Sequence, residues 1–148
     1  MTILINILLV IVSFLAMEGV AWFSHKYIMH GFMWSWHESH HIPHQDKFEK
    51  NDLFSVVFSI PSISCFLLGT LYPSLNFLIY IGLGILAYGL FYLIFHDIIV
   101  HRRVKIKYMA KSAYMRRLIR AHKVHHKTIG KEGATSFGFL IASKKYDE

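Results

Sequence analysis

Cysteine is almost absent from this 148-residue chain, which contains only Cys65, within an apolar run. A single cysteine excludes a disulfide framework and a zinc site built from several thiolates. Nucleotide-binding loops are also missing: residues 130–133 read GKEG without the G-x4-G-K-[ST] order, and no dinucleotide fingerprint occurs. We therefore expect the electrons for any redox chemistry to come from another protein.

Positive charge is absent from two long parts of the chain. No Lys or Arg occurs in residues 1–25 or 51–101, and all sixteen lie in 26–50 and 102–145. The chain is 54% hydrophobic and carries a formal net charge of +7. This separation predicts a membrane protein whose basic segments lie outside the bilayer, against anionic lipid headgroups. Nucleic-acid binding is not expected, because nothing resembles a recognition module.

Three apolar runs, at about 2–23, 53–72 and 75–95, predict spanning helices, since a helix needs roughly 20 apolar residues to cross a bilayer. The first run lacks a basic start and a small-residue cleavage site, so we expect a span rather than a signal peptide. The predicted fold is an all-α integral membrane helical bundle of about three spanning helices, in a single domain over residues 1–148.

The basic segments predict the orientation of these spans. Positively charged loops stay on the cytoplasmic side, which places residues 24–52 and 96–148 inside. Within the second segment, the pattern at 112–126 predicts an amphipathic helix near the interface. The consequence is that every histidine-rich segment lies on one face of the membrane.

Histidine is the abundant residue: ten of eleven histidines fall in the clusters HKYIMH, HESHH, HDIIVH and HKVHH. One unit, H-x4-H followed by H-x2-H-H, occurs twice. Imidazole is the commonest metal ligand in proteins, and ten in duplicate predict two metal ions with five nitrogens each. The candidate metal ligands are His25, His30, His37, His40, His41, His96, His101, His122, His125 and His126.

Helix geometry suggests how each cluster meets the ions. Residues turn by about 100° along an α-helix, so the three histidines of an H-x2-H-H triplet share one face. The two histidines of an H-x4-H pair, such as His25 and His30, stand about 140° apart on an ideal α-helix. We therefore expect the members of each pair to contact two neighbouring ions, one each.

Several other interpretations of the histidines stay open at this point. Bis-histidine haem ligation needs only two to four histidines facing each other within the bilayer. Imidazole suits zinc, copper, iron and nickel, but five nitrogens without a thiolate differ from four-coordinate structural zinc. A non-enzymatic membrane protein that binds or transports zinc is an alternative to an enzyme. A lone histidine such as His44 fits a polar cap at a helix end.

Acidic residues near the clusters could orient the imidazole rings. Glu38, Asp97, Asp46 and Asp52 are candidates to accept hydrogen bonds from histidine N–H groups. For Asp52 a helix-start role is the favoured interpretation. Glu18, the one charge in the first apolar run, is expected to reach the interface, with a partner role toward the metal site as the alternative.

The motifs resemble one family in sequence order. HKYIMHG, WSWHESHH, FEKNDLFSVVF, HDIIVHRR, AHKVHH and GKEGATSFGFL are similar to stretches of the bacterial β-carotene 3-hydroxylases, within the membrane fatty acid hydroxylase/sterol desaturase superfamily. The resemblance covers about residues 20–142. The histidine motifs alone indicate the superfamily, whereas the FEKNDL and KEG…SFGF stretches narrow it to the carotenoid enzymes.

The resemblance implies a non-haem enzyme with two Fe ions, O2 as oxidant and a ferredoxin-type electron donor. It implies hydroxylation of carbon 3 of the β-ring, from β-carotene through β-cryptoxanthin to zeaxanthin, in the bacterial inner membrane. A sterol or fatty-acyl hydroxylase or desaturase is the related alternative. No catalytic residue beyond the metal ligands is expected. A hypothetical allocation, partly guided by the resemblance, gives one ion His25, His37, His40, His96 and His122 and the other His30, His41, His101, His125 and His126.

Overall fold

The computed structural model describes residues 2–42 and 48–147, and His44 and Asp46 lie outside these residues. The described residues form helices and turns with no strand, which confirms the predicted all-α class. The α-helices are α1 (Ile3–Phe23), α2 (Trp34–His41), α3 (Leu53–Leu71), α4 (Leu78–Tyr92) and α5 (Ala113–His125). The other helical segments are π-helical η1 (Ser24–Phe32) and η4 (Leu93–Val100), and 3-10 helical η2 (Lys50–Asp52), η3 (Pro73–Leu75) and η5 (Lys144–Tyr146).

Three of these helices are long and apolar enough to cross a membrane, as predicted. They run over Ile3–Phe32, Lys50–Leu71 and Leu78–Val100. Leucine, isoleucine and valine side chains such as Leu8 and Val12 stand exposed on the outer surface, which suits contact with lipid. Two boundaries differ from the prediction, because the first and third spans each continue for about two turns in π-helical form, as η1 and η4.

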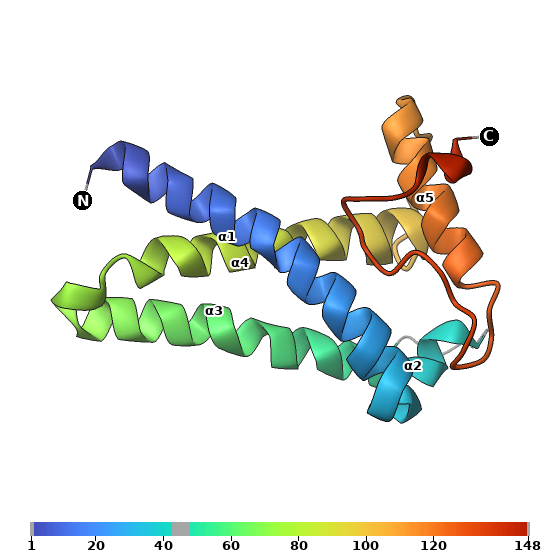
Figure 1. Cartoon of the computed structure of the whole chain (residues 1–148), viewed down its shortest axis with the longest axis horizontal. Helices are drawn as coiled ribbons and strands as arrows, with labels where there is room; N and C mark the ends of the chain where they lie inside the picture. The colour runs from blue at the N-terminus through green and yellow to red at the C-terminus, as the bar shows by residue number, and fades with distance from the viewer. Residues whose placement is uncertain (1, 43–47, 148) are drawn as a thin grey trace.

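Helix α4 contacts both of the other long helices: α3 lies alongside it, and α1 crosses it obliquely (Figure 1). Glycine allows the close approach of α1 and α4: a Cβ atom added at Gly84 would lie 2.5 Å from the carbonyl oxygen of Val10. On the other side of α4, the Ser62 hydroxyl donates a hydrogen bond to the carbonyl of Gly82, at 2.9 Å. Gly82 and Gly84 of the third span therefore serve helix packing.

The amphipathic helix α5 is capped by Ser112, whose hydroxyl accepts from the Met115 backbone N–H at 3.2 Å. Its buried Leu118 packs in a core cluster with Phe95, Val100 and Phe139. The apolar face of α5 thus covers protein, at the end of the molecule where η1, α2 and η4 also lie (Figure 1). All four histidine clusters gather at this end, as the charge pattern predicts.

Candidate metal centre

The ten predicted histidines converge in two groups, and within each group the five ligand nitrogens lie within 4.8 Å of one another. We call them the first and the second histidine group. The first group consists of His25, His30, His37, His41 and His125. The second group consists of His40, His96, His101, His122 and His126. Two clusters of five nitrogens match the number expected from the sequence.

The hypothetical allocation of histidines between two ions is wrong, because both H-x4-H pairs lie on π-helical segments. In a π-helix the backbone hydrogen bond joins residues five apart, and the His101 N–H does donate to the His96 carbonyl at 2.9 Å. The two rings of the pair therefore lie one turn apart on the same side of the helix, with ring centroids 4.4 Å apart, instead of facing away from each other. His25 and His30 likewise have ring centroids 5.3 Å apart and share the first group.

Each H-x2-H-H triplet is divided between the two groups. On α2, His37 and His41 are one turn apart and join the first group, whereas His40 joins the second. On α5 the division is reversed, because His122 and His126 join the second group and His125 the first. The one helix face that the three histidines of a triplet share thus reaches both groups, with the i and i+4 members in the same group.

Every ring in the first group has its Nδ1 atom next to an acceptor oxygen. Backbone carbonyls accept from four of them and the Asn51 side-chain oxygen accepts from His37 at 2.7 Å. The four carbonyl pairs are His25 with Phe137 (3.0 Å), His30 with Lys131 (2.9 Å), His41 with Thr128 (2.8 Å) and His125 with Thr135 (2.9 Å). Because a carbonyl can only accept, the proton of each of these four rings lies on Nδ1, and Nε2 carries a free lone pair.

These lone pairs point at one another. The Nε2 atoms of His25 and His37 are 3.0 Å apart, and those of His30 and His125 are 3.2 Å apart. Two unprotonated nitrogens cannot hydrogen-bond to each other, so the arrangement favours a cation between them. With metal–nitrogen bonds of 2.0–2.1 Å, two ligands at a right angle would stand about 3.0 Å apart, which agrees with the observed spacing. The donor set therefore fits a metal ion.

Two rings of the second group are oriented by carboxylates instead of carbonyls. The Nδ1–H groups of His40 and His96 donate to Glu49 and Asp97, at 2.8 and 2.7 Å. Their Nε2 atoms again face each other, at 2.9 Å. Carboxylate–imidazole pairs fix the ring and raise the basicity of the metal-binding nitrogen. The two groups thus share ligand geometry but differ in the charge of the atoms behind the ligands.

Burial keeps the histidines outside the spanning segments neutral. Desolvation lowers the pKa of His37 to about 2, and that of His125 to about 3. Burial also lowers the pKa of His41 and of His101 to about 4. At neutral pH these imidazoles carry no positive charge, so their free nitrogens can bind a cation without first losing a proton.

The predicted acidic partners are only partly correct. Asp97 accepts from His96 as expected. Glu38 is exposed and accepts no hydrogen bond from a histidine among the described residues. Asp52 has the favoured helix-start role, since its carboxylate accepts from the Glu49 backbone N–H at 3.0 Å. Sequence reasoning missed Glu49 and Asn51 as histidine partners. Both lie in the FEKND stretch, whose polar residues directly before an apolar run were the available signal.

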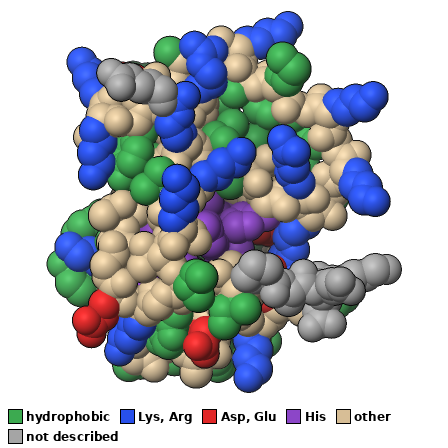
Figure 2. All heavy atoms as spheres, turned by 90° about the vertical axis from the view of Figure 1, so that its right-hand side faces the viewer, with side chains coloured by type: hydrophobic (Ala, Val, Ile, Leu, Met, Phe, Trp, Pro, Cys, Tyr) green, Lys and Arg blue, Asp and Glu red, His purple; other side chains and the backbone are tan. Residues whose placement is uncertain are grey.

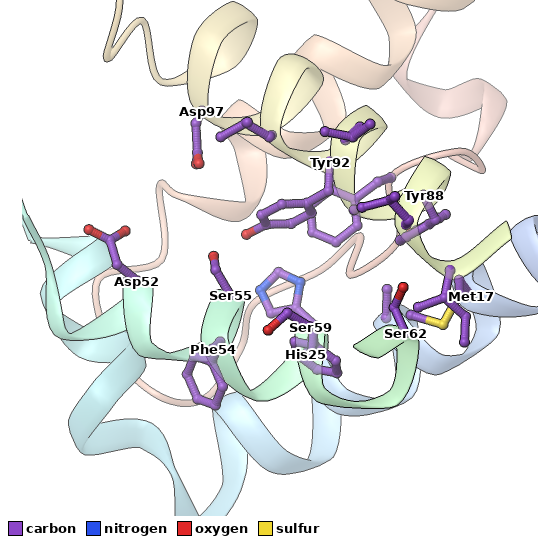
Figure 3. A pocket seen from close by; sticks show the side chains of 18 of the residues that line it. Met17, His25, Asp52, Phe54, Ser55, Ser59, Ser62, Tyr88, Tyr92 and Asp97 are labelled. Carbon is purple, nitrogen blue, oxygen red and sulfur yellow. The ribbon is translucent and has the colours of Figure 1, made fainter. Parts of the chain in front are cut away.

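A cavity of about 440 Å³ opens between α1, α3 and α4 and reaches the first group at His25 and His37. Figure 3 shows its polar end, with the carboxylates of Asp52 and Asp97 and the hydroxyl of Tyr92. The Tyr92 hydroxyl also lies 3.4 Å from Nε2 of His96. The far end is lined mainly by apolar side chains from the three long helices, and ligand sites commonly combine apolar walls with a few polar groups in this way.

Comparisons with known proteins agree with this geometry. The fatty acid hydroxylase family matches residues 10–144. Beta-carotene hydroxylase of Pseudescherichia vulneris is 47% identical over 146 residues, which cover 97% of this chain and 81% of that protein. Beta-carotene hydroxylase of Pantoea ananas is 48% identical over 139 residues, covering 93% of this chain and 77% of that protein. Beta-carotene hydroxylase 2, chloroplastic, of Capsicum annuum is 35% identical, covering 89% of this chain and 43% of that protein. No solved structure matches.

Proposed function

Because this chain belongs to the fatty acid hydroxylase family, we propose that it hydroxylates carotenoid β-rings at carbon 3, converting β-carotene through β-cryptoxanthin to zeaxanthin. The proposal includes two iron ions, one in each histidine group, and O2 as the oxidant. The observation that carries it is the convergence of unprotonated imidazole nitrogens in two groups of five, in a chain whose relatives are named beta-carotene hydroxylase.

The overall reaction fixes what the partners must supply. Replacing a ring C–H by C–OH consumes one O2, two electrons and two protons and releases one water. Bound iron ions supply the oxidant for the C–H bond, and the protein supplies geometry and excludes water. Since the sequence has no nucleotide fingerprint, the two electrons come from a separate ferredoxin-type donor. Lysine and arginine side chains border the opening in which histidines are visible, a surface suited to an acidic donor (Figure 2).

The cavity between the long helices suits the substrate. A C40 carotenoid is about as long as the hydrocarbon core is thick, roughly 30 Å, so a spanning polyene presents its ring near the helix ends. The cavity between α1, α3 and α4 would admit the ring from the bilayer and guide it to the histidine groups. We place this end on the cytoplasmic side of a bacterial inner membrane, from the positions of Lys and Arg.

Expression in a β-carotene-producing host tests the function. Aerobic cultures with the full chain should contain β-cryptoxanthin and zeaxanthin, and the purified protein should contain two irons. His122→Ala should abolish the product, because it removes a buried member of the second group, whereas the matched control Lys123→Ala changes an exposed neighbour on the same helix. Full chains that are expressed but yield no hydroxylated carotenoid would exclude the assignment and favour a sterol or fatty-acyl substrate.

A further inference from the structure

A buried carboxylate in the first membrane span holds the C-terminal part of the chain. Glu18 is only 7% exposed and lies on α1. Its Oε1 accepts from the backbone N–H groups of Phe139, Leu140 and Ile141, at 3.0, 2.9 and 3.1 Å. Its Oε2 accepts from the Tyr88 hydroxyl at 2.7 Å. A charge inside a membrane segment is expensive, and these four donors satisfy it.

The anchored residues directly follow the stretch that orients the first histidine group. Residues 128–137 supply all four backbone carbonyls that accept from rings of that group. This stretch has no regular secondary structure, so its own backbone hydrogen bonds do not hold it in place. The second group takes its described ring partners from Glu49 and Asp97, at the start of the second span and the end of the third.

We propose that Glu18 is a positioning residue for the first histidine group: its carboxylate holds residues 139–141, which keeps the carbonyls of residues 128–137 against the imidazole N–H groups. Glu18 touches no histidine among the described residues and acts only through this segment. The inference rests on the proposed metal site. It predicts selectivity, because among the described residues the carbonyls of this segment accept from rings of the first group alone, although the Phe139 ring packs against histidines of both groups.

Cobalt(II) titration of the full-length, chelator-treated protein in detergent tests this selectivity by visible absorption. The wild type should bind two cobalt ions. Glu18→Leu keeps the side-chain size but removes the acceptor, so the dissociation constant of one ion should rise about 10- to 100-fold while the other changes by less than about threefold. The dissociation constant of this ion in Glu18→Gln should lie between those of the wild type and Glu18→Leu, since the amide oxygen still accepts hydrogen bonds. The exposed control Glu38→Gln should behave like the wild type.

Two glycines test the same contact from the C-terminal side. A Cβ atom added at Gly138 would lie 2.5 Å from Oε1 of Glu18, so Gly138→Ala must push the segment away from the carboxylate. A Cβ atom added at Gly130 would meet no atom within 4 Å, so Gly130→Ala is the matched control. Gly138→Ala should raise the dissociation constant of one cobalt ion, as Glu18→Leu does. If Glu18→Leu cannot be purified, Glu18→Gln and this glycine pair decide the question.

A double variant identifies which group is affected. Asp97→Leu removes the acceptor of His96 and should weaken binding of the second group's ion. Combined with Glu18→Leu it should leave no tightly bound cobalt, since the two changes act on different ions. One remaining tight ion in the double variant, equal weakening of both ions by Glu18→Leu, or two tight ions in both Glu18→Leu and Gly138→Ala would overturn the proposal. The titration does not depend on hydroxylation, so failure of the proposed function would be seen separately in the carotenoid assay.

Discussion

Adding a methyl group at two glycines of α4 should change stability in opposite directions, because one glycine faces a neighbouring helix and the other faces the cavity. At Gly84 an added Cβ would lie 2.5 Å from the Val10 carbonyl oxygen and 2.6 Å from Cβ of Ser13. At Gly89, which lines the cavity, an added Cβ would meet nothing within 4 Å. Gly84→Ala should therefore lower the free energy of unfolding by about 1–3 kcal/mol through overpacking. Gly89→Ala should raise it by about 0.5–1 kcal/mol, because glycine is disfavoured in a helix interior.

The decisive change is Gly89→Leu, which adds an isobutyl group at the wall of the cavity of about 440 Å³, at a position where an added Cβ meets no atom within 4 Å. A ring displaced by about 1 Å from its reactive position can lose about 100-fold in rate, so turnover of β-carotene should fall by about that factor. The bound metal should stay at two ions per chain, because the ligands and their hydrogen-bond partners are unchanged.

Product formation by purified variants, metal content and thermal unfolding together form the assay. Gly89→Ala, with one added methyl, should retain most of its turnover and serves as the matched control for position. Wild-type turnover by Gly89→Leu with intact metal content would show that the substrate does not use this cavity. Loss of metal in the same variant would show instead that α4 has shifted, and the cavity argument would then have to be tested from α3.

Three further predictions concern the metal centre. Asn51→Leu removes the oxygen that accepts from His37 and should raise the dissociation constant of one metal ion about 10- to 100-fold in a metal titration. Unchanged affinity would show that Asn51 does not support metal binding. Tyr92→Phe should keep both ions but lower hydroxylation about tenfold, the effect of losing one hydrogen-bonding hydroxyl at the polar end of the cavity, and a wild-type rate would mean that this hydroxyl is only structural. Chelation should lower the unfolding temperature, since an ion at 100 times its dissociation constant adds about 2.7 kcal/mol; an equal temperature for the metal-free protein would contradict metal binding at these nitrogens.

The ten histidines that converge could be predicted from the sequence, whereas their division into two groups could not. Spacing and residue type suffice for the set, because few structures other than metal centres need ten clustered imidazoles. The division of the histidines between the two groups depends on local helix type. The same H-x4-H spacing places two rings on different sides of an α-helix but on the same side of a π-helix. Nothing in the composition of HKYIMH or HDIIVH distinguishes a π-helix from an α-helix, and assuming an α-helix wrongly separated His25 from His30 and His96 from His101.

Partners of the histidines were predictable only where they were neighbours in sequence. Asp97 adjoins His96, but Glu49 is nine residues from His40 and Asn51 is fourteen from His37. Backbone carbonyls leave no trace in residue identity, so the contribution of residues 128–137 was invisible before the fold. Glu18 was recognised as an unusual charge, but its partners lie 121 to 123 residues away and are backbone groups that any residue would carry.

These differences explain why the two histidine groups depend on different parts of the chain. The two carboxylate acceptors of the second group, Glu49 and Asp97, lie at the ends of two spanning helices, although the group also needs His122 and His126 from α5. The first group takes four of its five acceptors from a segment without regular structure, which follows α5 and is held by a residue of α1. Its geometry therefore requires the C-terminal segment to dock. Because metal ligands and their partners are ordered together, we expect metal binding at the first group to depend more strongly on this docking than metal binding at the second.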